Sequence, residues 1–117
     1  VVLPGGLGGV ASINACRTVL DVVKRAYDAG KFVAAICAGP TILARLGITD
    51  GKRATCYPGC EEQMGTAVCT GAQTERDGNV ITGQAAGASC AFGLELLSAL
   101  RGRTAAAQVA EGMVIRG

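Results

Sequence analysis

Residues 32–40 read Phe-Val-Ala-Ala-Ile-Cys-Ala-Gly-Pro, and this stretch decides the fold class of the chain. The continuous apolar run over residues 32–36 has the length and composition of a strand that is buried on both faces of a sheet. Cys37 follows the strand directly, and Pro40 suits the first turn of a helix. A strand that turns sharply into a helix is the building unit of an α/β domain with a parallel sheet.

The segments before this unit predict a strand, a loop and a helix. The chain opens with the β-rich run Val1-Val2-Leu3, followed by a glycine-rich stretch that we expect to form a loop over residues 4–12. Apolar residues recur at helical spacing over residues 15–29, and Asn14 is the candidate N-cap of that helix. Because the opening run stops at once in Pro-Gly-Gly, we expect it to be the second half of a strand, in a domain that lacks its first strand and helix.

The second half of the chain continues the alternation of strands and helices. The expected elements are a helix over residues 41–46, a strand over 53–57, a hairpin of 72–76 and 79–82, and helices over 89–100 and 105–111. The dipeptide Asp77-Gly78 is typical of a hairpin turn, and Thr104 is the candidate cap of the last helix. The pattern predicts one α/β domain over residues 1–117, with a mainly parallel sheet between two layers of helices.

The composition excludes several classes of protein. Half of the 117 residues are hydrophobic and the net charge is +2, which excludes a disordered chain. Only 3% are aromatic and the basic residues are not clustered, so we expect no nucleic-acid partner. No apolar run approaches the roughly 20 residues of a membrane span. We therefore expect a soluble, cytoplasmic protein that has no membrane partner.

Six cysteines are scattered along the chain, and most of them are expected to be small buried hydrophobic residues. They are Cys16, Cys37, Cys56, Cys60, Cys69 and Cys90. A disulfide framework is typical of small secreted chains without a sufficient core, which does not describe this chain. Zinc is disfavoured because residues 56–69 hold three cysteines but the chain has no histidine and no paired C-x2-C motif. We expect neither a metal nor a cofactor.

Cys37 is the candidate nucleophile. The sharp turn places its side chain at the carboxyl end of the sheet, above a helix N-terminus, where free amides stabilise a thiolate. The small neighbours Ala35, Ala38 and Gly39 suit such a turn, which corresponds to a nucleophile elbow with sulfur in place of oxygen. The sequence leaves open the alternative that Cys37 only fills a tight turn.

The stretch Pro4-Gly5-Gly6-Leu7-Gly8-Gly9 is the candidate oxyanion loop. Glycines at the end of a neighbouring strand can present bare backbone amides to a developing negative charge. The pattern Gly6-x-Gly8-x-x-Ala11 also fits a dinucleotide-binding motif, but that motif needs an acidic residue at the end of the next strand, where Cys37 stands instead. A surface loop without a catalytic role is the remaining alternative.

Together these motifs resemble the ThiJ/PfpI superfamily, and most closely the branch of parkinsonism-associated protein deglycases and their bacterial relatives. The resemblance covers nearly the whole chain. It rests on Leu-Pro-Gly-Gly at residues 3–6, Ala-Ala-Ile-Cys-Ala-Gly-Pro at 34–40, Thr-Cys-Tyr-Pro at 55–58, Arg-Asp-Gly-Asn-Val-Ile-Thr at 76–82 and Ala-Ala-Gln-Val at 106–109. It implies a flavodoxin-like three-layer α/β sandwich that forms homodimers.

The resemblance also implies a function and a site. Relatives are described as glyoxalases that need no cofactor and convert 2-oxoaldehydes such as methylglyoxal to lactate, as deglycases of glycated substrates, and as oxidative-stress chaperones. Cys37 would be the reactive cysteine, with the backbone amides of Gly6 and Ala38 at the oxyanion position. Its active-site neighbours would be Gly5, Tyr57 and Pro58. The alternative is a redox-sensing, chaperone-like binding protein in which Cys37 is oxidised to a sulfinate.

The chain departs from the family pattern at three points. The glutamate that hydrogen-bonds the cysteine in this family would fall before Val1. Tyr57 stands where many relatives carry a histidine, and residues 83–87 lack the arginine of the usual loop. A cysteine peptidase is disfavoured because it needs a histidine base.

Four further residues are candidates for a role beside Cys37. Glu61, Glu62 and Glu95 could replace the acid of the family, although loop glutamates are usually solvated and Glu95 is expected on the solvated side of its helix. Cys60 lies on the same loop as Tyr57 and could act as a resolving thiol if it approaches Cys37. The alternative is that Cys60 is an inert loop cysteine.

Overall fold

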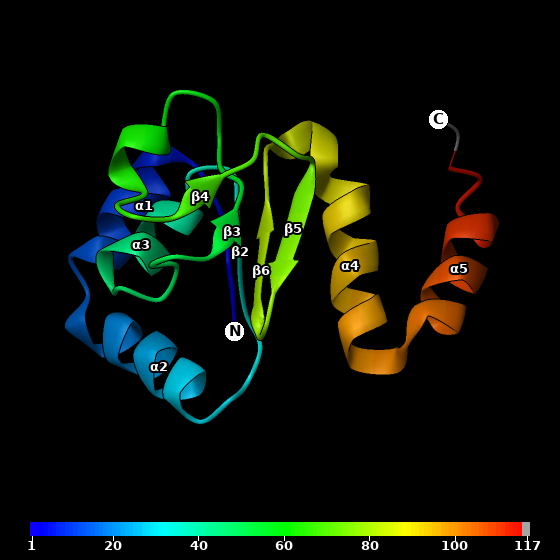
Figure 1. The fold of residues 1–117 in the computed structure, drawn as a ribbon, viewed down its shortest axis with the longest axis horizontal. Helices are drawn as coiled ribbons and strands as arrows, with labels where there is room; N and C mark the ends of the chain where they lie inside the picture. Colours follow the sequence, from blue (N-terminus) through cyan, green and yellow to red (C-terminus); the bar gives the residue numbers. More distant parts are fainter. Residues whose placement is uncertain (116–117) are drawn as a thin grey trace.

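The computed structural model describes residues 1–115, which fold around a central sheet of four strands in the order β1-β2-β6-β5 (Figure 1). β1 (Val2–Leu3), β2 (Val33–Ile36) and β6 (Val80–Gly83) run parallel, whereas β5 (Thr74–Asp77) pairs antiparallel with β6. The expected hairpin and the mainly parallel sheet are thus confirmed.

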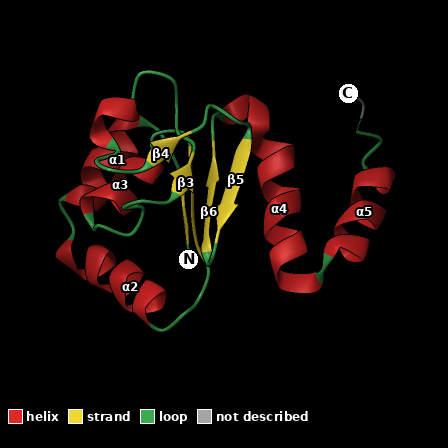
Figure 2. Cartoon of the chain, viewed as in Figure 1, coloured by secondary structure: helices red, strands yellow, loops and turns green. Residues whose placement is uncertain are grey.

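Helices cover both faces of this sheet and make the expected three layers (Figure 2). One layer contains α1 (Leu7–Asn14), α2 (Arg17–Asp28) and α3 (Pro40–Arg45). The opposite face is covered by α4 (Ser89–Arg101), and α5 (Arg103–Gly112) packs antiparallel against α4, farther from the sheet. The α/β sandwich class is confirmed, and no helix within residues 1–115 is long and apolar enough to cross a membrane.

A small parallel pair of strands flanks the α1–α3 layer. β3 (Arg53–Ala54) pairs with β4 (Val68–Cys69); one short 3-10 helix lies between them at Glu61–Gln63, and another precedes α4 at Ala86–Ala88. The strand expected over residues 53–57 is therefore wrong beyond Ala54. The next residues leave the ladder because Thr55 bonds elsewhere: its amide donates to Thr82 Oγ1 and its hydroxyl donates to the Ala72 carbonyl.

The alternating side chains of β2 divide the interior into two clusters. Val33 and Ala35 face the α1–α3 layer, where they join a large buried cluster that includes Val23, Ile42 and Leu43. The cluster on the α4 side is much smaller, and its fully buried members are Ala34, Ile81 and Phe92. The prediction that residues 32–36 form a strand buried on both faces is confirmed over Val33–Ile36.

The glycine-rich loop expected over residues 4–12 is wrong, because α1 begins at Leu7. Glycines lower helix propensity by only about 1 kcal/mol each, and burial of Val10 with partial burial of Ile13 on the same helix face offsets that cost. Gly6 precedes α1 in a left-handed conformation with φ of 86°. The loop that remains between β1 and α1 is therefore only Pro4-Gly5-Gly6.

Both expected side-chain caps are also wrong. Asn14 is the last residue of α1, and α2 starts after Cys16 without a side-chain hydrogen bond at its cap. Asn14 is partly buried instead, and its buried Oδ1 atom lacks a partner among the described residues. Thr104 lies inside α5, which begins at Arg103 after Gly102. The cap at Asn14 is wrong because Asn14 ends one helix instead of preceding the next, and the cap at Thr104 is wrong because α5 starts one residue before it.

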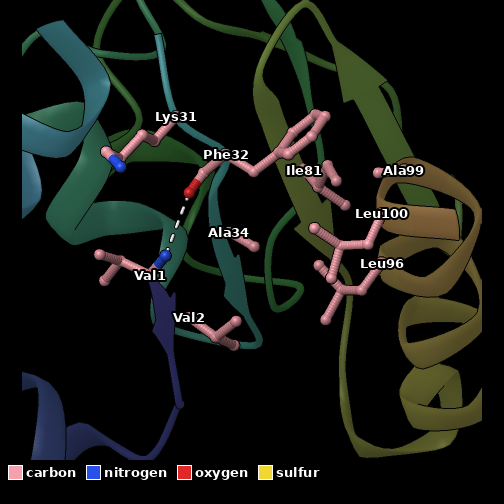
Figure 3. Close-up of a pocket in the computed structure, with 9 residues that line it drawn as sticks. All are labelled: Val1, Val2, Lys31, Phe32, Ala34, Ile81, Leu96, Ala99 and Leu100. Carbon is pink, nitrogen blue, oxygen red and sulfur yellow. Dashed lines mark hydrogen bonds between the residues drawn. The ribbon is translucent and has the colours of Figure 1, made fainter. Parts of the chain in front are cut away.

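An open apolar groove lies between the outer edge of the sheet and α4 (Figure 3). It has a volume of about 370 Å³ and is lined by Val1, Val2, Lys31, Phe32, Ala34, Ile81, Leu96, Ala99 and Leu100. The amino group of Val1 donates a hydrogen bond of 3.1 Å to the Phe32 carbonyl and closes one side of it. The groove lies on the α4 side of the sheet, opposite α3.

Candidate active site

Cys37 lies at the turn between β2 and α3 and has a left-handed backbone with φ of 66°. Residues other than glycine seldom adopt this region, and holding one there costs about 1–3 kcal/mol. Two hydrogen bonds fix the peptide: Cys37 N–H donates to the Gly83 carbonyl at 3.0 Å, and the Cys37 carbonyl accepts from Tyr57 N–H at 2.7 Å. The strand-to-helix elbow predicted from the sequence is thus present, with its thiol partly exposed.

Two glycines allow the elbow to form against the end of β1. A Cβ atom on Gly5 would lie 2.6 Å from Cys37 Cβ, and one on Gly39 would lie 2.9 Å from the carbonyl oxygens of Ile36 and Pro4. Both positions are therefore too crowded for any side chain. The Pro4-Gly5-Gly6 loop is held directly against the cysteine, as the sequence predicted for neighbouring strand ends.

The backbone amides of Gly6 and Ala38 directly follow, in the chain, the two residues that make this contact. Ala38 N lies 3.3 Å from the point where a Cβ atom of Gly5 would be. Within residues 1–115, neither the Gly6 nor the Ala38 amide donates a hydrogen bond to another backbone group or side chain. Such amides can bind an oxyanion at low cost, because no existing hydrogen bond must break first.

A β-turn from Tyr57 to Cys60 lies on the other side of the elbow. Cys60 N–H donates to the Tyr57 carbonyl at 2.9 Å, with Pro58 at the second position of the turn and Gly59 at the third, where φ is 102°. This arrangement is typical of a type II turn. The Tyr57 side chain is 49% exposed, whereas Cys60 is buried. Tyr57 therefore lies beside Cys37 through a backbone hydrogen bond, and Pro58 follows it in the turn.

Burial raises the pKa of two thiols on this side of the elbow, Cys56 and Cys60. Burial, followed by the nearby Cys69 thiol, raises the pKa of Cys56 from 9.0 to about 12. Burial also raises the pKa of Cys60, with smaller contributions from Cys37 and Glu61. Both groups are thus neutral thiols at neutral pH. Within residues 1–115, no group of three or more His, Cys, Asp or Glu side chains is arranged to hold a metal ion.

The three candidate carboxylates have different positions. Glu61 accepts hydrogen bonds from Gly59 N–H at 2.6 and 3.1 Å and so stiffens the turn, while Glu62 is exposed beside it. Glu95 is half-buried, which corrects the expectation that it is solvated, and it lines a hollow between α4 and α5. Among the hydrogen bonds of the described residues, none joins the Cys37 sulfur to a carboxylate.

Sequence reasoning missed the residues that hold the site together from β6. Gly83 accepts the hydrogen bond from Cys37 N–H, and Thr82 accepts the one from Thr55 N–H at 3.0 Å. Thr82 and Thr55 are both buried, and the Thr55 hydroxyl donates to the Ala72 carbonyl at 2.7 Å. The available signal was a threonine on a buried strand. Its hydroxyl requires a hydrogen-bond partner and so indicates a contact with another segment.

This geometry agrees with comparisons to known proteins. The family model described as DJ-1/PfpI family matches residues 1–99. The chain belongs to the DJ-1/PfpI family. This confirms the resemblance to the ThiJ/PfpI proteins and, with the solved structures below, the flavodoxin-like class of the fold.

Individual relatives of this DJ-1/PfpI chain are similar over nearly all of it. Protein dj-1beta of Drosophila melanogaster is 35% identical over 98% of the chain and 63% of the relative, and a protein of Pyrococcus abyssi named a deglycase is 32% identical over 86% and 61%. A crystal structure of a DJ-1 superfamily protein from Salmonella typhimurium superposes with a TM-score of 0.92 at 30% identity, covering 99% of this chain and 64% of that one. The chain thus spans less than two thirds of the length of these proteins.

Proposed function

We propose that this protein is a cofactor-independent cysteine enzyme that acts on small 2-oxoaldehydes or glycated substrates, with Cys37 as its nucleophile. The observation that carries the proposal is the left-handed backbone of Cys37 at the end of β2. Strain of this kind gathers at functional sites, where the surrounding structure imposes it. The deglycase name of the relative in Pyrococcus abyssi supports the same class of reaction.

The proposed reaction on methylglyoxal has three steps. The Cys37 thiolate attacks the aldehyde carbon, and the resulting oxyanion takes up a proton to give a hemithioacetal. A base then removes the proton from this carbon, and a proton returns to the neighbouring carbon, which leaves a thioester of a 2-hydroxy acid. Water hydrolyses the thioester, releasing lactate and regenerating the thiol.

The amides of Gly6 and Ala38 are the proposed stabilisers of the oxyanion in the first and last steps. Their support is that both are free of other hydrogen bonds in the described residues and that Gly5 packs directly on Cys37. Amides already aimed at a developing charge contribute on the order of 10²–10³ in rate for each donor. Gly5, Tyr57 and Pro58 would shape the entrance around the thiol.

The base that moves the proton between the two carbons must lie within about 3 Å of it. Glu61 is engaged with the Gly59 amide. We propose that the base is the glutamate which the family resemblance puts ahead of the Pro4-Gly5-Gly6 loop in sequence. The remaining parts of the proposal, a homodimer in the cytoplasm, are supported by the family resemblance.

The test is lactate production from methylglyoxal by protein expressed from the complete reading frame. Cys37→Ser should abolish turnover, because a serine hydroxyl lacks the acidity of a thiol and the chain has no histidine to activate it. Cys90 is an exposed cysteine on α4, so Cys90→Ser is the matched control and should produce lactate at the wild-type rate. Equal rates for the two variants would overturn the assignment of chemistry to Cys37.

A second candidate function uses the same groups without turnover. Oxidation of Cys37 to a sulfinate would place two oxygens beside the free amides of Gly6 and Ala38, which favours a redox-responsive binding protein. The lactate assay separates the two functions. A protein of this second kind would show Cys37 oxidation and no Cys37-dependent lactate.

A further inference from the structure

Cys37 and Cys60 are joined by a short relay of backbone hydrogen bonds. Tyr57 N–H donates to the Cys37 carbonyl at 2.7 Å, and Cys60 N–H donates to the Tyr57 carbonyl at 2.9 Å. The type II turn between Tyr57 and Cys60 therefore begins directly beside the elbow, and its hydrogen bond holds Cys60 next to Tyr57. Glu61 also accepts a hydrogen bond from the Gly59 amide, which stiffens the turn around Cys60.

The Cys60 side chain points into the protein and away from solvent. It is 7% exposed and belongs to the same buried cluster as Ala38, the residue after Cys37. Charge on Cys37 is felt at the Cys60 thiol, since Cys37 contributes to raising the pKa of Cys60. Cys60 is thus a buried thiol within electrostatic reach of the proposed nucleophile.

We propose that Cys37 and Cys60 form an intramolecular disulfide when a hydroperoxide oxidises Cys37, so that Cys60 is a resolving thiol and the pair is a reversible modification site. The inference rests on the reactive Cys37 of the proposed function. It adds Cys60 to the site and names a hydroperoxide as the oxidant. The product is a disulfide, which protects Cys37 from oxidation to the sulfinate.

The two steps balance as follows. The Cys37 thiolate attacks the outer oxygen of a hydroperoxide, the O–O bond breaks, and Cys37 becomes a sulfenic acid while the leaving oxygen takes a proton to give water or an alcohol. The Cys60 sulfur then attacks Cys37 Sγ, an S–S bond forms, and the S–O bond breaks. Hydroxide leaves and takes the Cys60 proton as water. The two cysteines lose two electrons and the peroxide gains them.

Oxidation of Cys37 itself favours the second step. Like charge on Cys37 is one cause of the raised pKa of Cys60, and a neutral sulfenic acid removes that charge. The Cys60 thiolate thus becomes easier to form once Cys37 carries the oxygen. A thiolate is the attacking species in such exchanges.

The other thiols are less suited to this role. Burial, followed by the nearby Cys69 thiol, raises the pKa of Cys56 to about 12. Cys56 and Cys69 line a hollow together with Glu61, whereas neither Cys37 nor Cys60 lines it. Cys16 and Cys90 are exposed, one between α1 and α2 and the other on α4. Cys60 is therefore the thiol we assign to Cys37.

Tryptic digestion separates the two cysteines of the pair. Cys37 falls in the peptide of residues 32–45, while Cys56, Cys60 and Cys69 share the peptide of residues 54–76. The protein is treated at neutral pH with two equivalents of hydrogen peroxide, because a disulfide consumes one equivalent and a sulfinate consumes two, and it is then blocked with iodoacetamide and mapped without reductant. We expect the two peptides to be linked in the unchanged protein, with an intact mass about 2 Da lower that dithiothreitol restores.

Two variants locate the link. Cys60→Ser should lose the linked peptides, and its Cys37 should instead gain about 32 Da as a sulfinate. Cys69→Ser removes a thiol from the same tryptic peptide and should retain the link, which makes it the matched control. A link that persists in Cys60→Ser, or an unchanged protein whose Cys37 carries the sulfinate or stays unoxidised, would overturn the proposal.

Mass mapping does not depend on turnover, so the two proposals fail separately. A link without Cys37-dependent lactate would remove the proposed function and leave the disulfide. Cys37-dependent lactate without a link would do the reverse.

Discussion

The two faces of the central sheet are built differently. Toward α1–α3 the sheet buries a continuous cluster that extends from Leu3 and Val23 through Ile42 to Met64. Toward α4 the buried cluster is small, and an open apolar groove runs along the edge of the sheet. The elbow and its amides belong to the well-packed side. A strained cysteine requires rigid surroundings, and within residues 1–115 the α1–α3 layer supplies them.

The largest expected effect is on the free energy of unfolding, and it compares a buried leucine on the α1–α3 side with an exposed leucine on the α4 side. Leu43 on α3 is 0% exposed, so Leu43→Ala should lower the free energy of unfolding by about 2–5 kcal/mol through lost burial and a residual cavity. Leu100 on α4 is 67% exposed, and Leu100→Ala should change it by less than about 0.5 kcal/mol. Urea titration monitored by circular dichroism measures both. Equal losses would show that the α4 side contributes as much to stability as the α1–α3 side.

The next effect compares the stability change of alanine at a crowded glycine of the elbow with that at a glycine in open space. Gly39→Ala places a Cβ atom 2.9 Å from the carbonyl oxygens of Ile36 and Pro4, and should cost about 1–3 kcal/mol because backbone must move. Gly93→Ala, inside α4 and in open space, should stabilise by about 0.5–1 kcal/mol. Thermal melts of the two variants beside the unchanged protein give the signs. A stabilising Gly39→Ala would contradict the close approach of β1 and the elbow.

A smaller effect isolates the strain at the nucleophile. Because φ of Cys37 is 66°, Cys37→Gly should be more stable than Cys37→Ala by about 1 kcal/mol, although neither variant can be active. The same pair of substitutions at Cys90 on helix α4 should give the opposite order, with alanine better by about 0.5–1 kcal/mol. Denaturant midpoints of the four variants decide the matter. The same order at both positions would remove the evidence for an imposed backbone at Cys37.

The smallest effect is a pH dependence confined to the α1–α3 side. The pKa of Cys56 is raised from 9.0 to about 12, so folding keeps a proton that the unfolded chain loses above pH 9. This contribution to stability is fully present below pH 9 and is lost as the pH rises toward 12. Stability measured in urea at pH 8 and pH 10 should therefore fall less steeply in Cys56→Ala. Cys90→Ala controls for the loss of a cysteine elsewhere, and an unchanged slope in Cys56→Ala would disprove the buried neutral thiol.

Several parts of the fold were predictable because they depend on neighbours in sequence. The buried strand before Cys37, the helix that starts at Pro40 and the hairpin around Gly78 all follow from local composition and turn chemistry. α1 was not predictable in this way. Its glycines oppose a helix locally, and only the pocket that receives Val10 and Ile13 favours one.

The candidate site divides along the same line. The sequence by itself determined that Cys37 stands at a strand-to-helix turn and that a glycine loop ends the neighbouring strand, because parallel strands bring their carboxyl ends together. Only the tertiary structure decided that Gly5 presses on Cys37, that Thr82 and Gly83 hold the site from β6, and that the turn from Tyr57 to Cys60 begins beside the elbow. These contacts join residues far apart in the chain, and their positions depend on how the layers pack rather than on local preference.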